Sequence, residues 1–220
     1  MAKIHKSEKE QLINYIYLFS SIIAFIIIAF LVADGKTNNF DDRILLELRS
    51  PLNRGVPVGP SWLMDNFRDV TALGSTVVVI IISVITSAYL IIEKKYLLAR
   101  LFLFSVIGGG VSDLILKEIF ARPRPVVVSH FIEVTTWSFP SGHAVMSVVV
   151  YFTLAYISTQ GLKNKALKNY INNAALIIAI IIGFSRVYLG VHNPTDVFAG
   201  WALGIALVSV SEIIFNGSVN

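Results

Sequence analysis

The sequence predicts an all-α, polytopic membrane protein with six transmembrane helices and short interfacial helices in the first long loop. Hydrophobic residues make up 55% of the 220 residues and charged residues only 15%, whereas a soluble domain has about 25% charged residues. Apolar stretches near the ~20 residues that a helix needs to cross the hydrocarbon core recur along the chain. Because these stretches occupy most of its length, we expect a single membrane domain over residues 1–220.

The charge and cysteine content exclude several classes of protein. The formal net charge is +4, and the chain has no basic run of the kind that binds nucleic acid. In a membrane protein such charge sets the orientation of the loops, so we expect the bilayer as a partner and no nucleic acid. Cysteine is absent, which excludes disulfides and thiolate metal sites. The composition leaves the oligomeric state open.

The apolar stretches are assigned to spans in chain order. The first has no charged residue and follows Lys3, Lys6 and Lys9. It exceeds the ~7–15 residues of a signal-peptide core and lacks a clear cleavage site, so we expect a retained helix. The third to fifth stretches overlap polar motifs at their ends, which makes those boundaries the hardest to place. The six expected spans are Gln11–Ala33, Leu73–Ile92, Leu97–Lys117, Gly142–Ser158, Asn173–Tyr188 and Val197–Phe215.

The long loop between the first two spans carries two helical patterns. An apolar stripe at helical spacing follows the acids Asp41 and Asp42, and a second stripe lies further along the loop. Short amphipathic helices in the membrane interface are the expected form, and a plain solvated loop is the alternative. The two stripes are Phe40, Ile44, Leu45 and Leu48, and Trp62, Leu63, Phe67 and Val70.

Six spans place both termini, and the links after spans two and four, on one side of the membrane. The basic residues are equally numerous on the two sides, but the orientation rule weights short loops. Much of the second set lies in the long 34–72 loop. We therefore expect cytoplasmic termini, polar motifs on the outer face, and location in a bacterial inner membrane.

The first polar motif, Pro140-Ser141-Gly142-His143, stands between a polar loop and an apolar helix. Ser141 is a suitable N-cap, and a helix N-terminus offers free N–H groups and a positive dipole to an anion. Gly142 permits close approach of that anion, and His143 would stand beside it as a proton donor. The plainer alternative is simple capping.

A second cluster of charges ends the third span. Arg presents a planar fork that matches phosphate oxygens, and Lys presents a compact charge. Two prolines keep the following chain extended, so that Arg124 can turn toward an anion near Lys117. The alternative is a basic flank that snorkels to the interface. We interpret Arg122 as interfacial and Asp113 as an ordinary i,i+4 partner of Lys117.

The third cluster contains Arg186, His192 and Asp196. Asn193 and Pro194 have the character of an N-cap and a first helical residue, which places Asp196 in the first turn of the last span, close to His192. A carboxylate bonded to one ring nitrogen fixes the tautomer and leaves the other nitrogen free to attack. An interfacial histidine beside a capping aspartate is the alternative.

Together these segments resemble the three motifs of the type 2 phosphatidic acid phosphatase (PAP2) superfamily, in its integral-membrane lipid phosphatase branch. Order and internal spacing are intact, and the motif core covers about residues 117–196. The vanadate-dependent haloperoxidases share the motifs, but the hydrophobic chain favours the membrane branch. The matching segments are Lys117-x6-Arg124-Pro125, Pro140-Ser141-Gly142-His143 and Ser185-Arg186-x5-His192-x3-Asp196.

The resemblance implies a reaction and a role for each residue. His192 attacks phosphorus and becomes a phosphohistidine, Asp196 orients His192, and His143 protonates the leaving oxygen and then helps to activate water. The resemblance implies no cofactor, because preorganised cations can replace a metal. The sequence shows no metal site, since the chain has four His and no Cys and its acids do not cluster. The residues expected to bind the phosphoryl oxygens are Lys117, Arg124, Ser141, Gly142 and Arg186.

The expected function is therefore hydrolysis of a lipid phosphate or a polyprenyl pyrophosphate. The candidate substrates are undecaprenyl pyrophosphate, phosphatidylglycerophosphate, phosphatidic acid and a lipid A phosphate, and the sequence does not choose among them. A lipid phosphotransferase with the same phosphohistidine is an alternative that the motifs leave open. A transporter whose charges line an ion path fits less well, because such charges would lie near the midplane rather than at helix ends.

Overall fold

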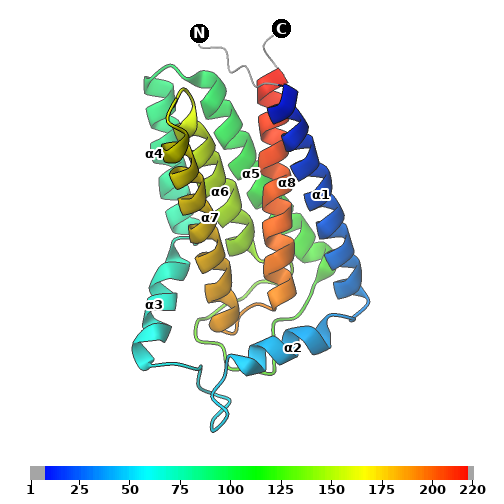
Figure 1. The fold of residues 1–220 in the computed structure, drawn as a ribbon. Coiled ribbons are helices and arrows are strands. Elements are labelled where there is room, and N and C mark those ends of the chain that lie inside the picture. Colours follow the sequence, from blue (N-terminus) through cyan, green and yellow to red (C-terminus); the bar gives the residue numbers. More distant parts are fainter. Residues whose placement is uncertain (1–7, 218–220) are drawn as a thin grey trace.

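The computed structural model describes residues 8–217, and within this range the chain forms eight α-helices (Figure 1). The long helices stand side by side as a bundle, and two short helices lie at its lower end. The described residues contain a single isolated β-bridge and no strand, as an all-α protein requires. In chain order the helices are α1 (Glu8–Ala33), α2 (Asn38–Glu47), α3 (Ser61–Ala72), α4 (Thr76–Ile92), α5 (Tyr96–Phe120), α6 (Gly142–Thr159), α7 (Lys165–Tyr188) and α8 (Pro194–Gly217).

The expected number of spans is confirmed in the described residues. Five helices are long and apolar enough to cross a membrane, and α3 with α4 makes a sixth span if this pair, bent by 42°, is counted as one. The basic residues Lys3 and Lys6, which entered the orientation argument, lie outside the described residues. The described chain ends, Glu8 and Gly217, lie at the same end of the bundle (Figure 1).

Several predicted spans begin elsewhere than expected, and in two of them a side-chain cap explains the difference. The second was placed from Leu73, but α4 begins at Thr76 because Ser75 caps it, with its Oγ atom accepting a hydrogen bond from the Val78 amide at 3.4 Å. The fifth was placed from Asn173, but α7 begins at Lys165, where Asn164 caps the helix. In both cases a side-chain cap, which hydropathy does not register, sets the start.

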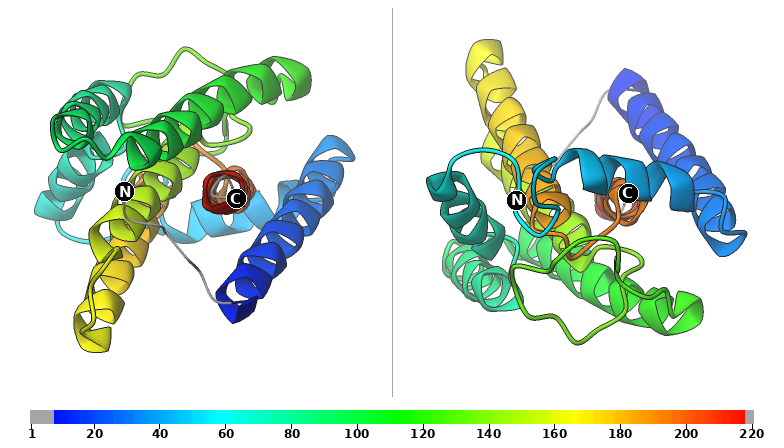
Figure 2. Two further views of the ribbon diagram at one scale, coloured as in Figure 1. Left: turned by 90° about the horizontal axis from the view of Figure 1, so that it is seen from above. Right: turned by 90° about the horizontal axis from the view of Figure 1, so that it is seen from below.

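Helix α8 occupies the middle of the bundle, between α1 on one side and α5, α6 and α7 on the other (Figure 2, left). Small residues make this packing possible. A Cβ added at Gly200 would lie 2.8 Å from Cβ of Ala144, and one at Gly204 would lie 2.7 Å from Cβ of Val148. Helices in a bilayer associate largely through such close contacts, so these glycines let α8 pack closely against α6.

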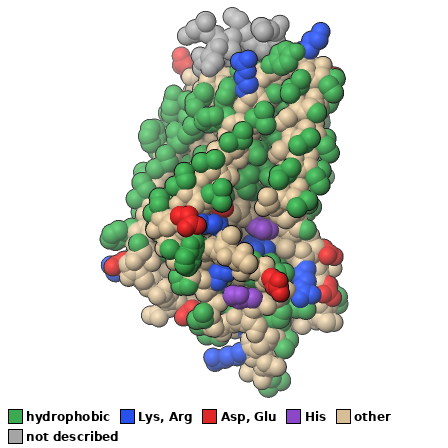
Figure 3. Space-filling model, turned by 180° about the vertical axis from the view of Figure 1, so that it is seen from behind, with side chains coloured by type: hydrophobic (Ala, Val, Ile, Leu, Met, Phe, Trp, Pro, Cys, Tyr) green, Lys and Arg blue, Asp and Glu red, His purple; other side chains and the backbone are tan. Residues whose placement is uncertain are grey.

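The outer surface of the bundle is apolar. Large hydrophobic side chains are exposed along α1, α4 and α5, and include Ile23, Phe30, Ile85 and Leu114. Figure 3 shows apolar side chains over most of the height of one face, with charged and histidine side chains below them. An apolar patch of this extent on a monomer marks a surface that contacts something other than water, and here it is the expected lipid boundary.

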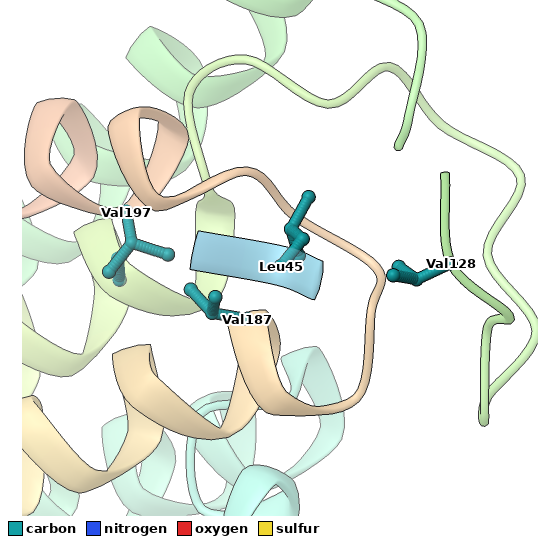
Figure 4. Packing of buried hydrophobic residues seen from close by; sticks show 5 residues of the cluster. Leu45, Val128, Val187 and Val197 are labelled. Carbon is teal, nitrogen blue, oxygen red and sulfur yellow. The ribbon is translucent and has the colours of Figure 1, made fainter. Parts of the chain in front are cut away.

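Helix α2 lies across the lower end of the bundle beneath α8 (Figure 2, right). Its residue Leu45 is fully buried in a cluster with Val128, Val187 and Val197 (Figure 4). These four residues come from α2, the 121–141 loop, the end of α7 and the start of α8. The cluster therefore fastens α2 to the three segments that carry the polar motifs.

Candidate active site

The three polar motifs meet at the end of the bundle opposite to Glu8 and Gly217 (Figure 1). The motif with Lys117 and Arg124 is at the end of α5 and in the loop after it. The Pro140-Ser141-Gly142-His143 motif begins α6, and the motif with His192 spans the junction of α7 and α8. Because the chain returns to this end after each pair of spans, segments far apart in sequence come together here. Figure 3 shows histidine and basic side chains gathered at the same level.

His192 lies in the short connection between α7 and α8. The preceding turn needs Gly190, which has a φ of 78° and where a Cβ would lie 2.5 Å from the Ser129 carbonyl oxygen. The imidazole is 2% exposed. Its Nδ1 atom faces Oδ2 of Asp196 at 3.5 Å, and its Nε2 atom lies 3.2 Å from an amino group of Arg124. The ring is thus held between a carboxylate and a guanidinium.

The carboxylate of Asp196 is fully buried in the first turn of α8. Its Oδ2 atom accepts hydrogen bonds from the Ser138 hydroxyl at 2.5 Å and the Asn193 amide at 2.8 Å, and its Oδ1 atom accepts one from Arg122 at 2.6 Å. The side chain therefore has no freedom to turn away from His192. Pro194 is the first residue of α8, as the sequence predicts.

The electrostatic surroundings keep His192 uncharged. Burial lowers its pKa well below the usual value near 6.5, and the charges of Arg186, Arg124 and Lys117 lower the pKa further, while Ser138 acts in the opposite direction. An unprotonated imidazole retains a lone pair on one nitrogen. With Nδ1 turned toward the carboxylate, the available lone pair is on Nε2, which points toward the cations.

Arg124 is locked in place by backbone carbonyls. It donates to the Thr136 carbonyl at 2.8 Å and to the Val191 carbonyl at 2.6 Å, and a further donor reaches the Thr136 hydroxyl at 3.1 Å. A pocket of about 690 Å³ opens beside it, between the ends of α1 and α5, and Asn193 also lines this pocket. The fork of Arg124 is preorganised next to a space that can hold part of a ligand.

Lys117 reaches the start of α6 from the last turn of α5. Its ammonium group contacts Asp113 and donates to the Pro140 carbonyl at 2.8 Å. The predicted i,i+4 pair of Lys117 with Asp113 is confirmed, although both side chains are largely buried rather than on a solvated face. A Cβ at Gly142 would lie 2.8 Å from Oδ2 of Asp113, so any other residue there would displace the carboxylate that pairs with Lys117.

The remaining predicted residues line the same region. The buried Arg186 donates to the Thr71 hydroxyl at 3.0 Å, and its Nε atom has no partner among the described residues. Ser141 precedes α6 as predicted, but its hydroxyl makes no capping bond and is buried without a partner in the described chain. His143 lies beside the break between α3 and α4, where a Cβ at Gly74 would come within 3.2 Å of its ring.

Comparison with known proteins identifies the family of this site. The sequence model of the PAP2 superfamily matches residues 98–218. The chain belongs to this superfamily. The matched PAP2 region runs from the start of α5 to the end of α8 and so contains all three motifs. The resemblance drawn from the motifs is thereby confirmed, and the protein is a multi-pass membrane member whose relatives are phosphatases.

Similar PAP2 proteins have names that specify lipid substrates. Phosphatidylglycerophosphatase B of Bacillus subtilis is 30% identical over 86% of this chain and 89% of its own length. An undecaprenyl-diphosphatase of Sulfolobus acidocaldarius is 34% identical over 50% of each chain. The crystal structure of a transmembrane PAP2-type phosphatidylglycerolphosphate phosphatase from Bacillus subtilis superposes with a TM-score of 0.79, at 28% identity, over 92% of this chain and 96% of that one.

Three residues that the sequence analysis did not place in the site belong to its hydrogen-bond network. Ser138 bonds Asp196, as described above. The interpretation of Arg122 as interfacial was wrong, because it is 11% exposed and bonded to Asp196 and Asp41. Asp41, interpreted as an acid in the first turn of an interfacial helix, is 1% exposed. No local pattern in the sequence relates Arg122 to Asp41, which lies 81 positions away.

Proposed function

We propose that this PAP2 protein hydrolyses a lipid phosphate or a polyprenyl pyrophosphate through a phosphohistidine on His192. The observation that carries the proposal is the position of the imidazole, with Asp196 at Nδ1 and Arg124 at Nε2. One nitrogen is aligned by a carboxylate and the other faces a group that binds phosphate oxygens. This is the arrangement that an activated nucleophile requires.

In the first step, the Nε2 lone pair of His192 attacks phosphorus and the bond from phosphorus to the leaving oxygen breaks. The ring gains positive charge as the new bond forms, and Asp196 stabilises that charge through the Nδ1 proton. His143, at the N-terminus of α6, gives a proton to the leaving oxygen. The product alcohol, or the lipid monophosphate from a pyrophosphate, then departs.

In the second step, water attacks the phosphohistidine and the bond from phosphorus to Nε2 breaks. The neutral His143 left by the first step accepts a proton from that water, so both steps use one proton carrier in opposite directions. Inorganic phosphate leaves, and His192 is again unprotonated at Nε2.

The phosphoryl oxygens are bound by groups already present in the chain. Lys117, Arg124 and Arg186 supply three positive charges, while Ser141 and the backbone at Gly142 supply neutral donors. Their donors with no partner in the described structure, such as Nε of Arg186 and the Ser141 hydroxyl, retain bonding capacity for an anion. Preorganised cations of this kind stabilise the charge that spreads over the equatorial oxygens, and we propose that no metal is needed.

The substrate class follows from the apolar exterior and from the names of the relatives. A phosphatidylglycerophosphatase and an undecaprenyl-diphosphatase make phosphatidylglycerophosphate and undecaprenyl pyrophosphate the first two candidates, with phosphatidic acid and a lipid A phosphate as the others. The whole of residues 1–220 is proposed to act as a single domain. We further propose that it lies in a bacterial inner membrane with cytoplasmic termini and the site on the outer face.

Phosphate release from the four lipid classes, measured with purified protein in detergent and excess EDTA, tests this function. We expect hydrolysis of at least one class at a rate that EDTA leaves nearly unchanged, inhibition by vanadate, and no activity in His192→Ala. Loss of activity on chelation with recovery on Mg²⁺ addition would contradict the metal-free mechanism. Transfer of the phosphoryl group to an added lipid alcohol in place of water would identify a phosphotransferase.

A further inference from the structure

Arg122 lies between two buried carboxylates from different parts of the chain. Its NH1 group donates to Oδ1 of Asp196 at 2.6 Å and to the Thr195 hydroxyl at 2.9 Å. Its NH2 group donates to Oδ2 of Asp41 at 2.8 Å and to the Thr37 hydroxyl at 3.3 Å. One guanidinium therefore joins the start of α2 to the start of α8. Burial works against its charge, but the two carboxylates outweigh this effect and raise its pKa.

Asp41 also holds the first turn of α8 directly. Its Oδ1 atom accepts a hydrogen bond from the Thr195 amide at 3.0 Å, and its Oδ2 atom accepts one from the Thr195 hydroxyl at 2.7 Å. The amides in the first turn of a helix have no partner within the helix. A carboxylate of α2 thus caps α8 from another element, one residue before Asp196.

The two oxygens of Asp196 have separate partners. Oδ1 is bound by Arg122, and Oδ2 faces the Nδ1 atom of His192. A carboxylate is planar and turns as a unit, so that fixing Oδ1 also fixes the direction of Oδ2. Arg122 therefore helps to set the orientation of the oxygen that faces the imidazole, together with the Ser138 hydroxyl and the Asn193 amide, which bond that oxygen directly.

A direct ion pair with Arg122 alone would weaken Asp196 as a partner of His192. A single carboxylate and a single guanidinium are neutral together, and the positive charge that forms on the imidazole during attack would face a neutral pair. With both carboxylates ionised, the three side chains of Asp41, Arg122 and Asp196 together carry one net negative charge. Electrostatic effects of this kind are strong in a buried, water-poor site.

We propose that Arg122 and Asp41 are positioning residues, in which Arg122 helps to set the direction of the Asp196 carboxylate and Asp41 supplies the negative charge that Arg122 would otherwise cancel. The short helix α2 is then part of the catalytic apparatus rather than only a covering of the membrane interface. This inference rests on the proposed function, because it assumes that Asp196 acts on His192.

The test compares Asp41→Asn, Arg122→Gln and the double variant with wild type, by steady-state phosphate release in detergent. Both substitutions keep a side chain that can form hydrogen bonds and remove one charge. We expect kcat to fall by about tenfold or more in each single variant, with KM changed by less than about threefold, since neither residue is assigned to the phosphate. The double variant has the same net charge around Asp196 as wild type but lacks the bonds of Arg122, so its loss of kcat is expected to be smaller than the product of the two single losses.

Asp69→Asn is the matched control, because Asp69 is an exposed acid of the other short helix, α3, and its side chain has no hydrogen bond or ion pair among the described residues. It is expected to keep wild-type kcat. Size-exclusion elution and thermal melting establish that each variant is folded. If only one single variant folds, the comparison of its kcat with that of the double variant still tests whether Arg122 and Asp41 act together.

Three results would overturn the inference. They are a folded Asp41→Asn variant with wild-type kcat, a double variant whose losses equal the product of the single losses, and failure of both single variants to fold, which would give the pair a role in folding alone. If wild type itself releases no phosphate, or His192→Ala stays active, the proposed function fails first. If wild type is active and His192→Ala is inactive, the proposed function stands. Any of the three results above then counts against the roles of Arg122 and Asp41 alone.

Discussion

Oδ2 of Asp196 lies 3.5 Å from Nδ1 of His192. This is longer than an ordinary N–H···O hydrogen bond, although both side chains are almost fully buried. Hydrogen bonds of catalytic groups are often long in the unliganded state and tighten when the substrate is bound. The distance therefore suits a contact that strengthens as the imidazole gains charge.

Replacement of the carboxylate by an amide tests the importance of this contact. Asp196→Asn keeps the size of the side chain but removes its charge, and it also allows the amide to impose the wrong tautomer on His192. We expect kcat to fall by about 10²–10⁴-fold in steady-state phosphate release, with the protein still folded. A folded variant within threefold of wild type would argue against any role of Asp196 in the reaction.

The two histidines are expected to respond differently to the leaving group. His192→Ala removes the proposed nucleophile and should be inactive on every substrate. His143→Ala removes the proposed proton donor, whose contribution of about 10²–10⁴-fold depends on the basicity of the leaving oxygen. It should therefore keep more activity on p-nitrophenyl phosphate or a pyrophosphate than on an alkyl phosphate, and a phosphoenzyme should accumulate. An active His192→Ala variant beside a fully inactive His143→Ala variant would exchange the two roles.

The low pKa of His192 predicts the position of the acid limb of the pH profile. Burial and the neighbouring cations keep the ring unprotonated in the free enzyme at pH 6.5 and below. The acid limb of kcat/KM, corrected for the second ionisation of the substrate phosphate near pH 6, should lie below pH 6.5. The unfolded chain takes up this proton first, so folding stability should decrease as the pH falls from 6.5. A limb centred above 6.5 would contradict the assigned environment.

A pair of glycines tests the helix packing. A Cβ at Gly183 in α7 would clash with the indole of Trp201 in α8, whereas at Gly110 in α5 no other side chain comes within 4 Å. Gly183→Ala should destabilise the protein by about 1–3 kcal/mol, the usual cost of overpacking. Gly110→Ala should leave stability unchanged or slightly higher. Thermal unfolding in detergent measures the stability of both variants. Equal effects of the two substitutions would contradict the close contact between Gly183 in α7 and Trp201 in α8.

Labelling of single cysteines tests the orientation. Thr135 lies exposed in the loop of the candidate active site and Asn169 lies exposed near the opposite end of the bundle. In intact cells, Thr135→Cys should react with an impermeant thiol reagent and Asn169→Cys should react only after the membrane is opened. The native chain has no cysteine, so the background is low. The reverse pattern would place the site on the cytoplasmic face.

The sequence predicted those features of the fold that depend on local pattern. Hydropathy located the spans, and the Pro194 helix start and the pairing of Asp113 with Lys117 follow from rules that act within one helical turn. The starts of α4 and α7 were misplaced because Ser75 and Asn164 are polar caps, which an average over apolar residues does not detect.

The interactions of Arg122 and Asp41 could not be predicted in the same way. The two residues are 81 positions apart, and no periodicity relates the start of α2 to the loop after α5. Each has a satisfactory local explanation, as a basic membrane flank and as an acid near a helix N-terminus. Only the return of α2 beneath α8, fastened by Leu45, brings them together, and that is a property of the tertiary structure.

All the residues of the candidate active site lie at one end of the bundle, and this position determines which leaflet can supply the substrate. A phosphorylated lipid in the opposite leaflet is out of reach until its headgroup has crossed the bilayer. The turnover of such a lipid in a cell is then coupled to transbilayer movement, and the supply from one leaflet to the other sets an upper limit on how fast the chemistry proceeds.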